Sequence, residues 1–256
     1  ASIVATSALR PTKGITALTI SAESVCALSS GGTAKCWGNN YNGQLGNGTT
    51  TNSSVPVTVS GLTGATAITS SPGNYCALLS GGTAKCWGWN DDGQLGNGTL
   101  TDSSVPVSVS GLTGATAITS AHASQYQHSF CALLGGGTAK CWGANDWGQL
   151  GNGTTTDSLV PVFVSGLTGA TAITTNGMDG YCALLSGGTA KCWGRNNYGQ
   201  LGNGTATDSL VPVSVSGLTG ATAITGNGYG SYCALLSGGT AKCWGYNGGG
   251  KLGNGT

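Results

Sequence analysis

Charged residues are scarce in this sequence. Only 7% of its 256 residues are Asp, Glu, Lys or Arg, against about a quarter in an ordinary soluble domain, and the net charge is +1. Because the basic excess is so small, a phosphate backbone or an anionic membrane surface would gain little electrostatic attraction. Uninterrupted apolar runs are only a few residues long, too short to span a bilayer. We therefore expect neither nucleic acid as a partner nor insertion into a membrane.

Several residue types that catalytic and metal sites need are almost absent. Glu23 is the only glutamate, whereas an EF-hand calcium loop closes with a glutamate. The only histidines, His122 and His128, are too few for a zinc site in every repeat. The glycine loop G-Q-L-G-N-G lacks the Lys-Ser/Thr ending of a phosphate loop, and no serine stands in a nucleophile elbow with a matching His and Asp. We expect no catalytic residue, no metal and no cofactor, and hence no enzyme.

Glycine and cysteine are abundant instead, and they recur with a regular spacing. The chain has 48 glycines and 10 cysteines. Segments of the type C-A-L-L-S-G-G-T-A-K-C-W-G begin at Cys26, Cys76, Cys131, Cys182 and Cys233, which lie 50, 55, 51 and 51 residues apart. A period near fifty residues is the signature of a propeller or a solenoid array. The chain is therefore built from five copies of one unit.

Each unit predicts four short β-strands. In the second unit these are ATAIT (65–69), CALLS (76–80), TAKCWG (83–88) and VPVSV (105–109). β-Branched residues with Gly, Asn and Ser between the segments favour sheet, and no window has a helical period. The small, alternating ATAIT fits a crowded innermost strand. The proline of Val-Pro-Val cannot donate to a ladder and fits an outermost edge strand. Four-stranded units arranged radially form an all-β propeller, here of five blades.

The order ATAIT, loop, CALLSGGTAKCWG and N-x-x-G-Q-L-G-N-G resembles the repeat of the regulator of chromosome condensation family, in its secreted, disulfide-containing bacterial type. The match covers essentially the whole chain, five times over. The resemblance implies a β-propeller. The founding member of the family has seven blades, whereas this chain has repeats for five and lacks the charged surface of a chromatin-bound exchange factor. The resemblance therefore implies the fold rather than the exchange activity.

The two ends of the sequence predict how the ring closes. The chain stops at Thr256, after the third strand of the fifth unit, so that unit lacks its edge strand. Residues 2–8 (SIVATSA) precede an innermost strand in KGITALT (13–19). We expect residues 2–8 to complete the fifth blade, which makes residues 1–256 a single domain and removes exposed strand edges. A rival arrangement makes the same pairing between chains, as a homo-oligomer that exchanges terminal strands and grows head to tail.

The two cysteines of each unit lie ten residues apart across a glycine turn. A three-residue hairpin loop with glycine in the left-handed position would place them directly opposite each other, at a separation compatible with a disulfide. A zinc array would need four ligands per ion, and free buried thiols are the simplest alternative. Disulfides imply an oxidising compartment, and therefore a secreted or cell-surface protein. We predict the five disulfides Cys26–Cys36, Cys76–Cys86, Cys131–Cys141, Cys182–Cys192 and Cys233–Cys243.

The repeats are nearly identical except in two loops of each unit, the loop between the first and second strands and the loop after C-W-G. In an up-down-up-down blade these two loops lie on the same face. Tyr, Trp and Arg, which dominate interface hot spots, are concentrated there. Unconstrained drift would also have changed the opposite turns, which scarcely vary. The residues that we predict to bind a partner are Tyr41, Trp89, Asp91, Asp92, His122, Tyr126, His128, Asp146, Trp147, Met178, Arg195, Tyr198, Tyr229 and Tyr246.

The aspartates and histidines of these loops are expected to be solvated. Asp91, Asp92, Asp146 and Asp179 fit turn residues that water keeps ionised. A glycosidase pair would instead need one carboxyl with a raised pKa. The two histidines lie in the longest variable loop, residues 120–130, where exposure to solvent is the expectation.

These features together predict a non-enzymatic recognition scaffold that contacts its partner through the face of variable loops. A protein partner is favoured over a surface glycan, because the loops differ between blades whereas a multivalent lectin more often repeats one site. The resembling family includes a secreted propeller-type inhibitor of β-lactamase, so a secreted protein inhibitor is one alternative. A surface or filament subunit assembled by strand donation is another, and a multivalent lectin is the third.

Overall fold

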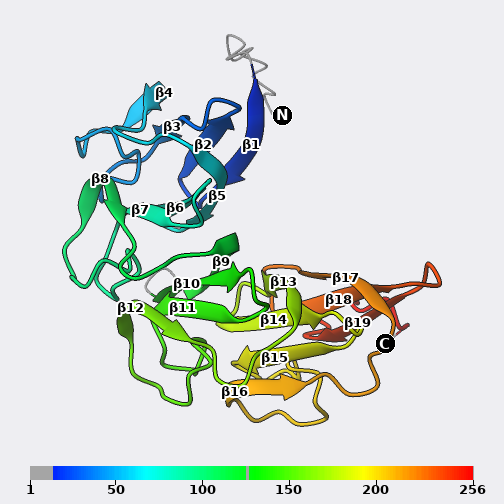
Figure 1. Ribbon diagram of the computed structural model, residues 1–256. Helices are drawn as coiled ribbons and strands as arrows, with labels where there is room; N and C mark the ends of the chain where they lie inside the picture. Colours follow the sequence, from blue (N-terminus) through cyan, green and yellow to red (C-terminus); the bar gives the residue numbers. More distant parts are fainter. Residues whose placement is uncertain (1–13, 125–126, 256) are drawn as a thin grey trace.

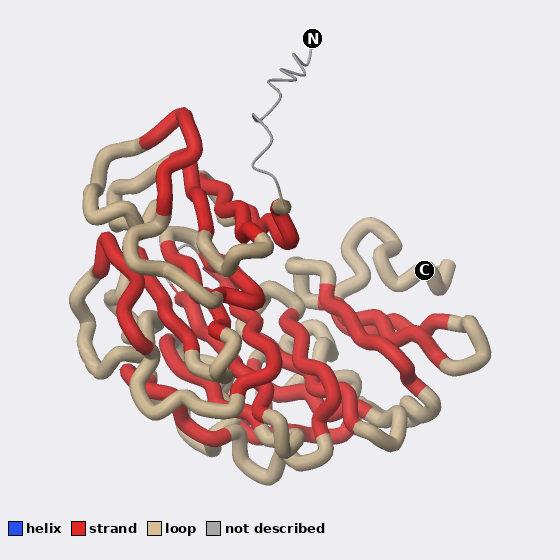
Figure 2. Tube along the Cα trace, turned by 45° about the horizontal axis from the view of Figure 1, so that its top comes forward, coloured by secondary structure: helices blue, strands red, loops and turns tan. Residues whose placement is uncertain are grey.

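The computed structural model describes residues 14–124 and 127–255 of the chain. Every regular element within these residues is a β-strand, and Figure 2 shows strands joined by loops. The strands form five antiparallel sheets, four of them with four strands and one with three. In this part of the chain no helix has the length and apolar character to cross a membrane. The all-β class predicted from the sequence is confirmed.

The five sheets follow the chain, and we call them blades 1 to 5. Within each blade the strands lie in sequence order, from an inner to an outer strand. The inner strands are β1 (Ile15–Ile20), β5 (Ala65–Ser71), β9 (Ala115–Ser124), β13 (Ala170–Thr175) and β17 (Ala221–Gly226). The second strands are β2 (Ser24–Ser29), β6 (Asn74–Leu79), β10 (Gln127–Leu134), β14 (Gly180–Leu185) and β18 (Ser231–Leu236). The third strands are β3 (Ala34–Gly38), β7 (Ala84–Gly88), β11 (Ala139–Gly143), β15 (Ala190–Gly194) and β19 (Ala241–Gly245). The outer strands are β4 (Ser53–Thr58), β8 (Ser103–Ser108), β12 (Ser158–Phe163) and β16 (Ser209–Ser214).

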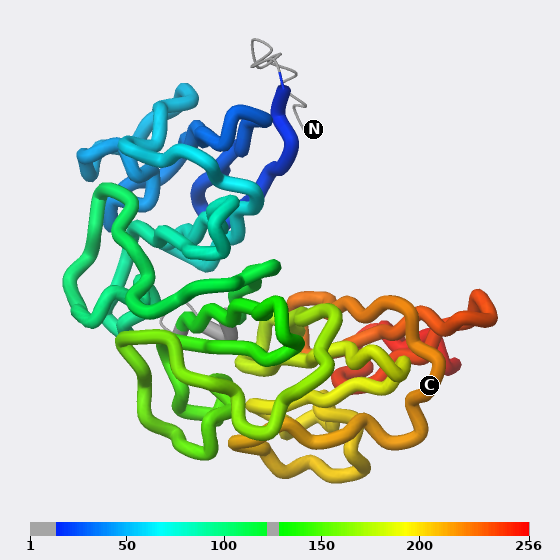
Figure 3. Tube along the Cα trace, viewed as in Figure 1, coloured from blue at the N-terminus to red at the C-terminus, as the bar shows by residue number. Residues whose placement is uncertain are grey.

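The blades succeed one another along a curved arc, which the colours of Figure 3 trace from blue to red. Their inner strands contact each other in the order β1, β5, β9, β13 and β17. This confirms that the ATAIT segments are innermost and the proline-containing strands outermost. Blades 1 and 5 form the two separate ends of the arc in Figure 1. Blade 5 has three strands within the described residues, and the predicted closing strand, residues 2–8, lies outside them.

The glycine turns, S-G-G in four blades and G-G-G (135–137) in blade 3, bring the cysteines of each blade together as predicted. In blade 2 the Leu79 N–H donates to the Thr83 carbonyl over 2.8 Å, and Gly82 has a φ of 71°, the left-handed conformation that this loop requires. Cys76 consequently stands opposite Cys86, with 4.1 Å between their Cα atoms. All ten cysteines are bonded in this way, which excludes the zinc and free-thiol alternatives. The disulfides are Cys26–Cys36, Cys76–Cys86, Cys131–Cys141, Cys182–Cys192 and Cys233–Cys243.

In blades 2 to 5 the tryptophan of the C-W-G segment forms a hydrogen bond to the preceding blade. In blade 2 Trp87 is fully buried and stacks on Tyr75, with ring centroids 5.9 Å apart. Its indole N–H donates to the carbonyl of Gln44 in blade 1 over 2.9 Å, which satisfies the one polar group of a buried indole. The equivalent bonds at the other three junctions come from Trp142, Trp193 and Trp244.

A buried asparagine shapes the long loop that joins the third strand to the fourth. In blade 2 the Asn90 amide donates to the carbonyls of Thr99 and Thr101 over 2.9 and 3.0 Å, and its oxygen accepts from the Leu95 N–H over 2.8 Å. One side chain therefore satisfies three backbone groups of a loop that has no ladder of its own. The same role falls to Asn40, Asn145 and Asn196.

One segment folds differently from its prediction. The sequence predicts an exposed loop over residues 120–130, but β9 and β10 extend into it as a longer hairpin. His128 is paired with His122 across this hairpin and is fully buried. Its ring meets Trp89 of the preceding blade edge-on, with 5.2 Å between the ring centroids. The expectation of a solvent-exposed histidine is therefore wrong for His128, because the extra residues lengthen the strands and turn its ring towards blade 2.

Candidate binding face

The two variable loops of each blade emerge at the same end of the sheets, as predicted. Strands in each blade alternate in direction, so the β1–β2 and β3–β4 connections of blade 1 share one end. The S-G-G and G-L-T-G turns occupy the other end. Residues from both kinds of variable loop line one pocket, which confirms that they lie together. We call this end the variable-loop face.

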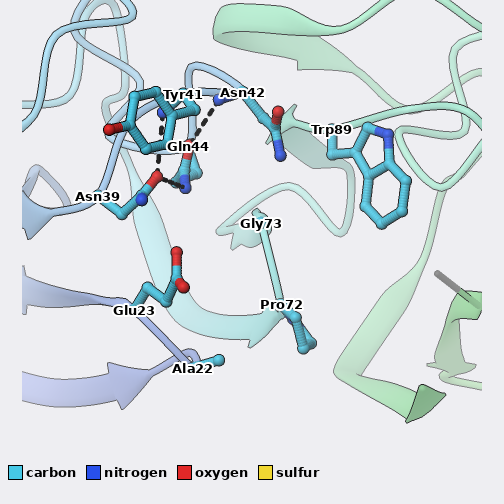
Figure 4. Close-up of a pocket in the computed structure, with 9 residues that line it drawn as sticks. All are labelled: Ala22, Glu23, Asn39, Tyr41, Asn42, Gln44, Pro72, Gly73 and Trp89. Carbon is cyan, nitrogen blue, oxygen red and sulfur yellow. Dashed lines mark hydrogen bonds between the residues drawn. The ribbon is translucent and has the colours of Figure 1, made fainter. Parts of the chain in front are cut away.

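A pocket of about 420 Å³ opens on the variable-loop face between blades 1 and 2. Figure 4 shows Glu23 and Tyr41 on one side of it and Trp89 on the other, with Gly73 between them. Glu23 comes from the β1–β2 loop and Gly73 from the β5–β6 turn. Tyr41 follows β3, and Trp89 follows β7 at the equivalent place in the next blade. Four loops from two blades therefore build the pocket.

Hydrogen bonds within blade 1 fix the polar wall of the pocket. The Gln44 side-chain amide donates to Asn39 Oδ1 over 2.8 Å, and the Tyr41 backbone N–H donates to the same oxygen over 3.0 Å. The Asn42 N–H donates to Gln44 Oε1 over 3.0 Å. The Glu23 side chain is exposed, and its carboxylate has no hydrogen bond or ion pair with a described residue. The pocket is thus lined by one exposed carboxylate, that of Glu23, and by the ring of Tyr41, which is 73% exposed.

A carboxyl group with a raised pKa lies where blades 2 and 3 meet. Burial raises the pKa of Asp92 to about 6, and the negative charges of Asp157, Asp91 and Asp146 add to the effect. A hydrogen bond from the backbone of His128 opposes the shift. Asp92 is half-buried, so the expectation of an ordinary solvated turn residue is wrong here. The group nevertheless remains mostly ionised at neutral pH.

Aromatic and cationic side chains connect the loops of the later blades. The Arg195 guanidinium of blade 4 lies 4.6 Å from the ring centroid of Trp147 in blade 3. Tyr198 of blade 4 and Tyr246 of blade 5 have ring centroids 4.9 Å apart. Such contacts hold side chains of neighbouring blades against each other, each with about 0.5–1 kcal/mol at an exposed site. The variable loops consequently form a connected surface rather than separate tips.

The predicted binding residues differ in how far they are accessible. The side chains of His122 and Tyr126 lie outside the described part of the structure, and His128 is buried. The exposed ones are Tyr41, Asp91, Asp146, Tyr198, Tyr229 and Tyr246. The half-buried ones are Trp89, Asp92, Trp147, Met178 and Arg195.

Two features of this face were missed from the sequence. The polar pocket wall of Glu23, Asn39 and Gln44 was not predicted, although a single glutamate placed in a variable loop was a usable signal. Asp179 was expected to be solvated, but its side chain is only 1% exposed. It occupies a left-handed backbone position with a φ of 53°, a conformation that Asp tolerates better than most residues. Asp179 is buried because of the way the β13–β14 loop packs, and the local sequence does not predict this packing.

Repeated antiparallel blades with a constant frame and variable loops at one end define a β-propeller repeat protein. The family model described as regulator of chromosome condensation (RCC1) repeat matches residues 32–79, 83–132, 138–175 and 189–235. A second model of the same description matches residues 15–44 and 65–94. These matches cover well over half of the chain. The chain belongs to the RCC1 repeat family.

Curated relatives share the repeat over part of this chain. Human E3 ubiquitin-protein ligase HERC2 is 34% identical over 136 residues, which are 50% of this chain and 3% of that protein. The ultraviolet-B receptor UVR8 of Arabidopsis thaliana is 38% identical over 80 residues, 31% of this chain and 18% of that protein. The chain therefore spans only a small share of these relatives.

Solved structures of the same fold cover nearly the whole chain. Human WBSCR16 superposes with a TM-score of 0.77 at 22% identity, covering 93% of this chain and 63% of that one. Yeast RCC1 (Prp20), solved with Kap60, superposes with a TM-score of 0.59 at 16% identity, covering 94% of this chain and 72% of that one. At these identities the likeness establishes the propeller fold and nothing beyond it.

Proposed function

We propose that this protein is a non-enzymatic binding scaffold that contacts a protein partner through the variable-loop face. The contrast between the two ends of the blades carries this proposal. Turns at one end repeat almost unchanged, whereas the loops at the other end gather exposed aromatic residues. Tyr41, Tyr229 and Tyr198 are 73%, 65% and 47% exposed. Exposed tyrosines on a rigid frame are typical anchors of protein interfaces.

A protein partner fits this face better than a small repeated ligand. The five blades present different side chains, so a single asymmetric partner would contact several unlike loops at once. Among structures of the fold, yeast RCC1 has been solved bound to another protein, Kap60. Such recognition needs neither a nucleophile nor a cofactor.

We also propose that binding takes place outside the cell or at its surface, including a role in adhesion. Five disulfides suit an oxidising compartment, because cytosolic reductants keep thiols free. The scarcity of charge and the polar Asn, Ser and Thr loops also suit an exposed, soluble scaffold.

The test is to replace Tyr41 and Tyr229 together by alanine. Both rings are exposed, so the double variant should keep its melting temperature. Binding should fall by about tenfold or more, because truncating an interface anchor costs about 1–2 kcal/mol or more. Capture of surface proteins from the native environment on the immobilised chain, followed by titration of the captured protein, measures the effect.

Phe163→Ser is the matched control. Phe163 is a 59% exposed aromatic residue on the outer strand β12, away from the variable loops. The equivalent positions of three other blades hold Thr58, Ser108 and Ser214, so the frame accommodates the change. The control should bind like the wild type. Equal binding by the tyrosine double variant would refute the proposed face.

A further inference from the structure

Acidic residues are confined to one end of the molecule. Asp102, Asp157 and Asp208 accept backbone hydrogen bonds from Asn90, Asn145 and Asn196 where the outer strands leave the variable-loop face. The others stand in the variable loops themselves. The eight acidic residues of the chain, all on this face, are Glu23, Asp91, Asp92, Asp102, Asp146, Asp157, Asp179 and Asp208.

Five of the seven lysines lie towards the opposite end. One stands in the third strand of every blade, beside the S-G-G turn. In blades 2 to 5 its ammonium donates to a carbonyl of the G-L-T-G turn before that blade's inner strand, over 2.9–3.4 Å. These residues are Lys35, Lys85, Lys140, Lys191 and Lys242. A molecule of almost no net charge is therefore strongly polarised from one end to the other.

The basic residues of the variable-loop face do not balance its acids. Within the described residues they are Arg195 and Lys251, which belong to blades 4 and 5. Arg195 covers the ring of Trp147, and the Lys251 ammonium lies 4.3 Å from the ring centroid of Tyr229. Two positive charges thus face eight negative ones. The loops of blades 1 to 3 carry only acids, so the potential there is negative and attracts cations.

The pocket between blades 1 and 2 provides a concave site within this negatively charged region. Glu23 and Tyr41 both line it and are exposed. A carboxylate binds a Lys or Arg side chain by a charge-assisted hydrogen bond, and an aromatic ring binds one by a cation–π contact. Asn74, next to Gly73, is fully buried and donates to the Trp89 carbonyl. Its Oδ1 accepts no hydrogen bond from a described residue. Because Asn74 is buried and does not line the pocket, the charged acceptor that the pocket offers to a ligand is the exposed Glu23 carboxylate.

We propose that the variable-loop face binds a basic segment of a protein partner, with one Lys or Arg side chain in the pocket formed by Glu23 and Tyr41. Asp91, Asp92 and Asp146 continue the negative surface from this pocket over blades 2 and 3. The inference rests on the proposed function, since it names the chemistry of the partner at the same face. Phosphorylated and other acidic ligands are repelled there.

The experiment measures the affinity of three labelled probes by fluorescence anisotropy. They are an Arg/Lys–Gly octapeptide, the same peptide with Glu in place of the basic residues, and a neutral oligosaccharide of similar size. The basic peptide should bind at least about tenfold more tightly than the other two. Its affinity should fall between about 50 and about 300 mM salt, because screening weakens attraction between exposed charges.

Glu23→Gln tests the pocket itself. This variant should bind the basic peptide about tenfold more weakly, which is the usual effect of losing a charge-assisted contact. Glu23→Asp should recover part of the affinity. Asp146→Asn removes the same charge from the same face but outside the pocket and should stay within about threefold of the wild type, as expected for an exposed rim charge. Lys85→Gln changes the opposite end and should leave the affinity unchanged.

Each outcome decides a separate claim. Equal losses in Glu23→Gln and Asp146→Asn would show attraction to the whole face and overturn the pocket as the anchor. If the protein bound the acidic peptide or the oligosaccharide more tightly than the basic peptide, the claim that the partner segment is basic would be overturned. If the tyrosine double variant still loses its native partner in either case, the proposed function stands and only this inference falls. If no variant of the face affects any partner, both fall.

Discussion

Single substitutions show where the binding face departs from the repeat. In blade 1 the Gln44 amide donates to Asn39, but in blade 2 the position of Asn39 is occupied by Trp89. The side-chain nitrogen of the equivalent, fully buried Gln94 has no hydrogen-bond partner among the described residues. An unsatisfied buried amide destabilises a fold by about 1–3 kcal/mol. Trp89 takes the place of the asparagine that would accept this hydrogen bond. A substitution that destabilises the fold in this way is expected at a position whose residue is determined by function rather than by folding.

Asp92 gives a prediction about pH. Its pKa is raised by burial to about 6 from an ordinary value of 3.8. The folded state therefore holds the proton more tightly than the unfolded state, and the free energy of unfolding falls as the pH rises from about 4 to about 6. Asp92→Asn should remove this fall and stabilise the protein at pH 7. We expect roughly 1 kcal/mol, after allowance for solvent screening of a half-buried group.

Urea unfolding at about pH 4 and about pH 7 measures the effect of Asp92→Asn. The variant and the wild type should differ less at the lower pH, because the carboxyl is then protonated in the folded state and about half protonated in the unfolded state. Asp91→Asn is the matched control, because it removes the same charge from the exposed neighbouring residue. A wild type and an Asp92→Asn variant with parallel pH profiles would contradict the raised pKa.

Residue burial was the least predictable property of the face. Aspartates and histidines in a variable loop were expected to be solvated, yet His128 is buried and Asp92 is half-buried. The reason is that both lie against a neighbouring blade, and the hairpin of blade 3 is longer than its counterparts. Exposed tyrosines such as Tyr41 and Tyr229 were predictable, because they stand in loops rich in Gly and Asn, beyond the ends of the strands.

At the scale of the element, the blade was almost completely predictable. The S-G-G turn fixes the register of the second and third strands, and Cys76 then has to face Cys86. The proline in Val-Pro-Val confines that strand to an edge. This pattern occurs four times and the C-W-G pattern five times, and the repetition makes the assignment of such short strands unambiguous. Strand ends were less predictable where no copy was available for comparison, as in residues 120–130.

Removing one hairpin disulfide tests what it contributes to a blade. Cys76→Ala with Cys86→Ala should lower the free energy of unfolding by about 2–3 kcal/mol, since the bond closes a loop of about ten residues in the unfolded chain. The fold should persist, because the same cross-strand pairs and the Trp87 stack remain. The midpoint of urea unfolding measures the loss, with reduced wild type as the control that loses all five bonds. An unchanged midpoint would contradict the expectation.

At the scale of the whole molecule, four identical junctions leave two unmatched ends. Trp37 of blade 1 is equivalent to the tryptophans that donate a hydrogen bond to the preceding blade in blades 2 to 5. It is half-buried, and its indole N–H forms no hydrogen bond with a described residue. Leu235 of blade 5 is 48% exposed, whereas the equivalent Leu78 and Leu184 are 4% and 5% exposed. The Trp37 side of blade 1 and the Leu235 side of blade 5 therefore correspond to the two surfaces that pack together at each of the other junctions.

We predict that residues 2–8 supply the outer strand of blade 5 in the same chain, because closure removes both an exposed strand edge and exposed apolar side chains. The full chain should then be a monomer at every concentration, and deletion of residues 1–13 should lower its melting temperature without changing its mass in solution. Light scattering and thermal unfolding of both forms measure this. A full chain that polymerises with concentration, and becomes monomeric after the deletion, would show instead that the strand is donated to a neighbouring chain.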